Sequence, residues 1–84
     1  MASVDPTLEA VFAEPTRANI RWRDIERMLR RLGAEVSGGE GSRVRIALNG
    51  VRAVVHRPHP RPQAPKPLVR AVRRFLINAN VRPT

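Results

Sequence analysis

The stretch "RVRIALNGVRAVVH", residues 43–56, decides the fold of this chain. In its first half, Val44, Ile46 and Leu48 alternate with two arginines and an alanine, which is the period of a half-buried β-strand. Asn49-Gly50 is the strongest short-range signal for a two-residue hairpin turn, because both residues accept a positive φ. The stretch therefore predicts an antiparallel hairpin with one apolar face and one basic face.

The turn also predicts the register of this hairpin. If Leu48 pairs with Val51, each later pair follows, and the ladder ends with Arg43 opposite His56. The predicted pairs on the buried face are Leu48–Val51, Ile46–Ala53 and Val44–Val55, and those on the open face are Ala47–Arg52, Arg45–Val54 and Arg43–His56. Arg43 and His56 are therefore expected to be neighbours on the open face.

Two amphipathic segments flank the hairpin. Residues 20–33 predict a helix that ends at Gly33, and residues 67–81 predict another that has Pro67 in its first turn. The apolar residues at helical spacing are Trp22, Ile25, Met28, Leu29 and Leu32 in the first, and Leu68, Val72, Phe75, Leu76 and Ala79 in the second. We interpret Trp22 as a core anchor, and Ile77 falls off the main apolar stripe. The charged face of the first helix is typical of a solvated surface with ion pairs at i and i+4.

The remaining segments complete an α+β order. Residues 34–37 predict a short strand before a glycine-rich turn, and residues 57–67 hold five prolines, which is typical of a stiff, extended connector. Near the start, Asp5 and Pro6 form the N-cap and first position of a short helix. We therefore predict a helical arm over residues 1–19 and a domain over residues 20–84, with two helices on one face of a three-stranded antiparallel sheet.

The charge of the chain is concentrated in its second half. Residues 1–40 hold seven acids and six arginines, whereas residues 41–84 hold ten basic residues and no acid, which accounts for the net charge of +9. A polycation of this kind binds nucleic acid, an anionic membrane or an acidic protein. The chain has no cysteine, no apolar run of the roughly 20 residues needed to span a membrane and no signal-peptide pattern, so we expect a soluble, cytoplasmic protein.

The types of residue present favour RNA chemistry over other chemistries. His56 and His59 lack cysteine or nearby carboxylate partners for zinc, and neither a nucleophilic serine arrangement nor a phosphate-binding loop is recognisable. RNA supplies its own nucleophile, the ribose 2′-hydroxyl, so a protein needs only a base, an acid and cations, which histidine and arginine provide without metal or cofactor. A histidine beside proline is also common as an ordinary turn residue.

The order of several short motifs resembles the HicA family, the small toxins of bacterial toxin-antitoxin pairs. The motifs are "W-x-D-I-E-x-M-L", "LGAEV", "GxGSRVRIALNG", "RPHP" and "NANV", and they span residues 22–81. The resemblance implies a double-stranded-RNA-binding-like αβββα fold. It also implies an mRNA interferase, a metal-independent endoribonuclease that acts as a toxin and is neutralised by a HicB-type antitoxin.

The resemblance fails at one important position. The family pattern has its catalytic histidine after the glycine-serine turn, where this chain has Arg43. We hypothesise that His56 acts as general base or acid, that Arg43 stabilises phosphate charge, and that His59 assists or binds the RNA backbone. The residues expected to bind RNA are Ser42, Arg45, Arg52, Arg57, Arg61 and Lys66.

Two alternatives stay open. Arg43 can mark a catalytically inactive double-stranded-RNA-binding-like module that binds RNA or a protein partner. In the other alternative the proline segment or the last helix docks a protein partner or DNA.

Overall fold

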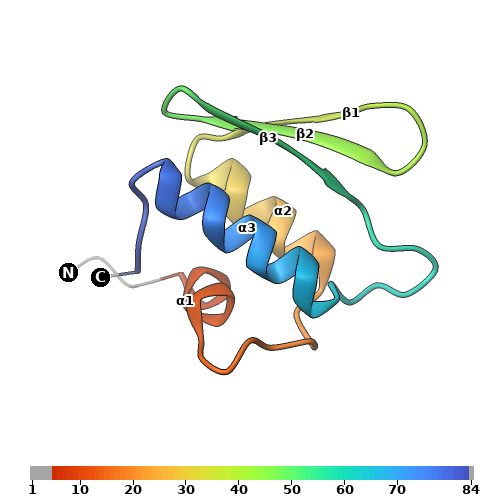
Figure 1. Cartoon of the computed structure of the whole chain (residues 1–84), viewed down its shortest axis with the longest axis horizontal. Coiled ribbons are helices and arrows are strands. Elements are labelled where there is room, and N and C mark those ends of the chain that lie inside the picture. Colours follow the sequence, from red (N-terminus) through yellow and green to blue (C-terminus); the bar gives the residue numbers. More distant parts are fainter. Residues whose placement is uncertain (1–4, 84) are drawn as a thin grey trace.

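The predicted hairpin forms the centre of the fold in a computed structural model, which describes residues 5–83. The elements are α1 (Pro6–Phe12), α2 (Trp22–Arg31), β1 (Glu35–Gly38), β2 (Arg43–Leu48), β3 (Val51–His56) and α3 (Lys66–Asn78). The strands form one antiparallel sheet in the order β1-β2-β3, and α2 and α3 lie together on one face of it (Figure 1). From α2 onward the order is αβββα, so the predicted α+β fold is confirmed.

The register of the hairpin agrees with the prediction at all six pairs, from Leu48–Val51 to Arg43–His56. Asn49 and Gly50 have φ values of 51° and 81°, the left-handed conformation that a tight hairpin turn requires. Asn49 also has a role that its sequence neighbours do not indicate, because its Nδ2 donates a hydrogen bond of 2.8 Å to the carbonyl of Ala79. The turn is thereby fixed to the end of α3.

The core lies between the sheet and the two helices. Its fully buried side chains come from the inner face of β2 and from α2, α3 and α1, and include Val44, Ile46, Ile25, Met28, Leu29, Val69, Val72, Leu76 and Val11. Trp22 is only 6% exposed, and its Nε1 donates to Glu26 Oε1 at 3.1 Å, so the interpretation of Trp22 as a core anchor is confirmed. Val69 is also fully buried, although the predicted stripe omitted it.

The proline-rich connector between β3 and α3 is held against the start of α2. The amide of Trp22 donates to the carbonyl of Pro62 at 2.9 Å, and the amide of Ala64 donates to the carbonyl of Ile20 at 2.7 Å. Ala64 itself is fully buried. The connector is therefore anchored near its end by an isolated β-bridge between Arg21 and Gln63, which its composition does not reveal.

The short helix α1 packs against α2 and α3 on the side away from the sheet (Figure 1). Asp5 is its N-cap, as predicted, and accepts a hydrogen bond from the amide of Thr7 at 2.9 Å. Two arginines hold the two ends of the helix. Arg31 donates to the Asp5 carboxylate at 2.7 and 2.9 Å, and Arg73 donates to the carbonyls of Val11 and Ala13 and to the side chains of Glu14 and Thr16. Residues 1–4 of the predicted arm lie outside the described residues.

The contact between Asp5 and Arg31 is expected to make stability depend on pH in the acid range. Burial raises the pKa of Asp5, but hydrogen bonds from Arg31 and from the amide of Thr7 together lower it below its ordinary value of 3.8. A carboxyl group whose pKa is lower in the folded chain stabilises the fold fully at pH values above its pKa in the unfolded chain. This contribution is lost as pH falls through the pKa of the folded chain.

Asp5→Asn keeps an N-cap side chain but removes the charge, so it should lower the free energy of unfolding by about 0.5–1 kcal/mol at pH 7. This difference should shrink below about pH 4. Urea unfolding at pH 7 and pH 3 measures it, with Glu9→Gln as the control because Glu9 is an exposed carboxylate of the same helix. An equal difference at both pH values would contradict the role of the Asp5 charge.

Candidate functional site

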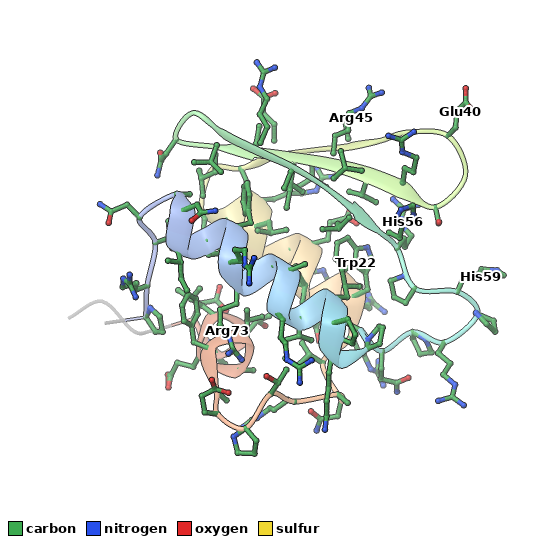
Figure 2. All side chains as sticks on the ribbon, in the orientation of Figure 1. Trp22, Glu40, Arg45, His56, His59 and Arg73 are labelled. Atoms are coloured by element: carbon green, nitrogen blue, oxygen red, sulfur yellow. The ribbon has the colours of Figure 1, made fainter. Side chains whose placement is uncertain are left out.

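The face of the sheet that points away from the helices is basic. Arg43, Arg45 and Arg52 are exposed on it, and Arg45 extends directly away from the helical layer (Figure 2). Within residues 5–83 none of these three guanidinium groups forms an ion pair with a carboxylate. The open face therefore presents cationic groups that are available to an anionic partner.

At one end of this face, three predicted site residues come together. Arg43 and His56 are direct cross-strand partners, and such partners have Cβ atoms about 4.5–5.5 Å apart. Ser42 Oγ lies 3.4 Å from His56 Nδ1, within hydrogen-bonding distance. The amide of Arg57 donates to the carbonyl of Ser42 at 2.7 Å, which extends the pairing beyond the strands. We call Ser42, Arg43 and His56 the hairpin-end cluster.

The geometry of the hairpin-end cluster leaves one imidazole nitrogen available. Ser42 is within hydrogen-bonding distance of Nδ1, and no hydrogen bond within residues 5–83 engages Nε2. A serine hydroxyl both donates and accepts, so it can stabilise either neutral tautomer of the ring. The β1–β2 turn is held by the amide of Arg43, which donates to the carbonyl of Glu40, and Figure 2 shows the Glu40 side chain pointing away from His56.

The second histidine lies elsewhere. His59 is on the outer bend of the connector, apart from His56 and directed away from it (Figure 2). Together with Arg61, Lys66 and several prolines it lines a groove whose other side is formed by Ala18 and Asn19. The structure thus groups His59 with two predicted RNA-binding residues rather than with the hairpin-end cluster.

A shallow hollow lies over the middle of the open face. The side chains around it come from all three strands, because Glu35, Ala47 and Arg52 form one cross-strand row and Ser37, Arg45 and Val54 form the next. Sequence reasoning missed Glu35 and Ser37. Glu35 and Ser37 are two residues apart in the predicted strand over residues 34–37, which indicates that they share one face. Only the pairing of β1 with β2 shows that this is the open face.

Within residues 5–83, no three histidine, aspartate or glutamate side chains come together as metal ligands. None of the three helices in the same part of the chain has the length and apolar character needed to cross a lipid bilayer.

Comparison with known proteins identifies the family. No curated protein and no solved structure gives a significant match. A protein-family model described as "HicA toxin of bacterial toxin-antitoxin" matches residues 22–80, from the first residue of α2 to just beyond α3. Because the match spans well over half of the 84 residues, the chain belongs to the HicA toxin family, whose members pair with antitoxins in toxin-antitoxin systems.

Proposed function

We propose that this chain is a toxin that binds and cleaves mRNA in the cytoplasm without a metal ion, and that a HicB-type antitoxin neutralises it. The observation that carries the proposal is the cross-strand pair of Arg43 and His56 on the open basic face, with Ser42 beside the imidazole. In this proposal residues 20–84 form the RNA-binding domain and residues 1–19 form an N-terminal arm, of which helix α1 packs against α2 and α3.

The reaction that fits these side chains is an internal transesterification. The ribose 2′-oxygen attacks phosphorus while the bond to the 5′-oxygen of the next nucleotide breaks, which yields a 2′,3′-cyclic phosphate and a free 5′-hydroxyl. His56 carries one of the two protons, either taking it from the 2′-hydroxyl or giving it to the 5′-oxygen, and water carries the other. No electron transfer or outside nucleophile is needed.

The neighbours of His56 support this chemistry. Ser42 Oγ lies 3.4 Å from Nδ1, and Nε2 of this exposed imidazole has no hydrogen bond within residues 5–83, so Nε2 is available to an RNA phosphate. The guanidinium of Arg43 suits the two non-bridging phosphate oxygens, which gain negative charge as the 2′-oxygen attacks. The two residues therefore have complementary roles, with His56 moving a proton and Arg43 stabilising charge.

The remaining basic residues suit binding of the RNA strand. Arg57 directly follows His56, Arg45 and Arg52 are exposed further along the open face toward the Asn49-Gly50 turn, and the groove with His59, Arg61 and Lys66 follows along the connector. The separation of the two histidines in Figure 2 favours a role for His59 in contacting the RNA backbone rather than in proton transfer. Binding through so many cations should weaken steeply with salt.

The second candidate function is an inactive module that binds RNA or a protein partner. Arg43 favours it, because the family pattern that this sequence resembles has its catalytic histidine at that position. The two candidates differ in one respect only, which is whether His56 supplies the missing imidazole from the opposite strand.

Incubating the purified chain with a short RNA in excess EDTA tests the proposed activity. We expect cleavage products that end in a 2′,3′-cyclic phosphate and a 5′-hydroxyl, because the 2′-hydroxyl is the nucleophile. The same oligonucleotide with 2′-O-methyl groups at every position is the matched control, and it should bind but stay intact. Salt-sensitive binding of both oligonucleotides with no cleavage of either would favour the inactive module.

A further inference from the structure

We propose that the hollow over Ala47 is the anchoring site for the antitoxin. It takes an apolar side chain that is flanked by carboxylates in the antitoxin chain. This site is distinct from the hairpin-end cluster. Antitoxin anchoring then depends on Ala47 and Val54 and RNA cleavage on the hairpin-end cluster, whereas Arg45 and Arg52, which are also expected to bind RNA, are shared by both partners. The inference rests on the proposed function wherever toxicity is the readout.

The shape of the hollow follows from the short side chain of Ala47. This residue lies in the central strand between Glu35 on β1 and Arg52 on β3, and both of its neighbours carry longer side chains. The next row places Ser37, Arg45 and Val54 side by side, and these six side chains line the depression. A single side chain of a partner can therefore rest over Ala47 and contact the longer side chains beside it.

The floor and wall of the hollow include apolar surface that the fold itself does not use. Val54 is 48% exposed, which is more than the other exposed large hydrophobic residue of the described chain, Ile77 at 37%. Beside it, Ala47 adds a methyl group that is only partly buried. An apolar centre within a charged rim is the usual arrangement of an energetically dominant contact in protein interfaces.

The charges around the hollow select an acidic partner. Arg45 and Arg52 are exposed, and neither forms an ion pair within residues 5–83. Each guanidinium can bind one carboxylate through two parallel hydrogen bonds. A partner segment with an apolar side chain between acidic residues therefore complements both the centre and the rim.

The apolar surface of the hollow makes RNA a less favourable occupant than a protein segment. Exposed Val54 and the Ala47 methyl group provide no hydrogen bond to a sugar or a phosphate, whereas an apolar side chain of a protein gains free energy by covering them. By contrast, the hairpin-end cluster combines a guanidinium, an imidazole and a hydroxyl, all of which can bind a phosphate oxygen. The open face is thus divided into a centre suited to protein and an end suited to RNA.

Two substitutions test this division, with the HicB-type antitoxin encoded beside the gene as the binding probe. Ala47→Gln fills the hollow without adding charge, and Val54→Thr keeps the β-branched shape while replacing a methyl group by a hydroxyl. We expect Ala47→Gln to raise the Kd for the antitoxin about 30-fold or more, and Val54→Thr to raise it about tenfold. Ile77→Thr, which makes the same kind of change on α3, is the matched control and should leave the Kd unchanged.

Growth assays and RNA cleavage separate the possible results. We expect cells that express Ala47→Gln to stop growing even when the antitoxin is co-expressed, while the purified variant cleaves RNA at the normal rate. Unchanged antitoxin affinity in both variants would overturn the inference. If a variant lost RNA binding but kept normal antitoxin affinity, the inference would also be wrong, because the hollow would then bind RNA. If the wild-type chain neither arrests growth nor cleaves RNA, the proposed function fails, and the measured Kd values still decide the inference.

Discussion

Replacing His56 by alanine is expected to slow RNA cleavage about 10²–10⁴-fold, the range lost when a general acid or base is removed. The effect should appear in the single-turnover rate at saturating protein, because the imidazole acts on the reacting atoms. Affinity for a 2′-O-methyl RNA, which cannot react, should change much less. Cells that express the variant without antitoxin should grow normally.

His59→Ala is the matched control for this prediction, since it removes the only other imidazole of the chain. His59 lies in the connector groove with Arg61 and Lys66, so its loss should weaken RNA binding severalfold and leave the single-turnover rate nearly unchanged. If His56→Ala cleaved RNA at the wild-type rate, the role of His56 in proton transfer would be wrong. If His59→Ala alone lost the single-turnover rate, His59 would be the acid or base instead.

The parts of this fold that sequence patterns predict are those that depend on nearby residues. The hairpin register follows from Asn49-Gly50 and from alternation within six residues on each side, so the proximity of Arg43 and His56 could be predicted as well. The N-cap at Asp5 and the helix end at Gly33 are local in the same sense.

Contacts between distant segments could not be read from such patterns. Arg73 is spaced like a solvent-facing residue of α3, yet its guanidinium reaches residues about 60 positions earlier and holds the end of α1. The hydrogen bond from Asn49 to Ala79 joins residues 30 positions apart. No period within a helix or strand encodes these pairs, because they depend on how elements pack against one another.

In the candidate site, too, local patterns predict some positions, and contacts between distant segments determine others. The pairing of Arg43 with His56 depends on one turn, whereas the position of His59 depends on the path of the connector. That path is set by the pairing of Pro62 with Trp22, the first residue of α2, and of Ala64 with Ile20. The hollow over Ala47 needs the register of β1 against β2, which no turn signal specifies, since a flexible glycine-rich segment joins the two strands.

The arrangement of the helices also limits where partners can bind. Helix α1 covers part of the helical layer on the side opposite the sheet, and it is held there by Arg31 and Arg73 (Figure 1). The open sheet face has no such cover within residues 5–83. The open face is therefore accessible to both proposed partners.

Replacing Arg43 by alanine is expected to slow cleavage about 10²–10³-fold, the loss typical of removing one group that stabilises charge in the transition state. Arg43→Lys keeps a positive charge but not the planar fork, so its rate should fall between those of the wild type and the alanine variant. Single-turnover rates measure both effects, and affinity for 2′-O-methyl RNA shows whether binding changes in parallel.

Arg43→His tests how the chain departs from the family pattern. It puts an imidazole directly opposite His56, so one ring can act as base and the other as acid, and we expect cleavage to remain well above that of Arg43→Ala. In the double variant Arg43→His/His56→Ala, activity that equals the wild type would mean that an imidazole on either strand serves the same reaction. An inactive wild type that gains cleavage only through Arg43→His would instead establish that Arg43 has disabled the site and that His56 does not replace the missing histidine.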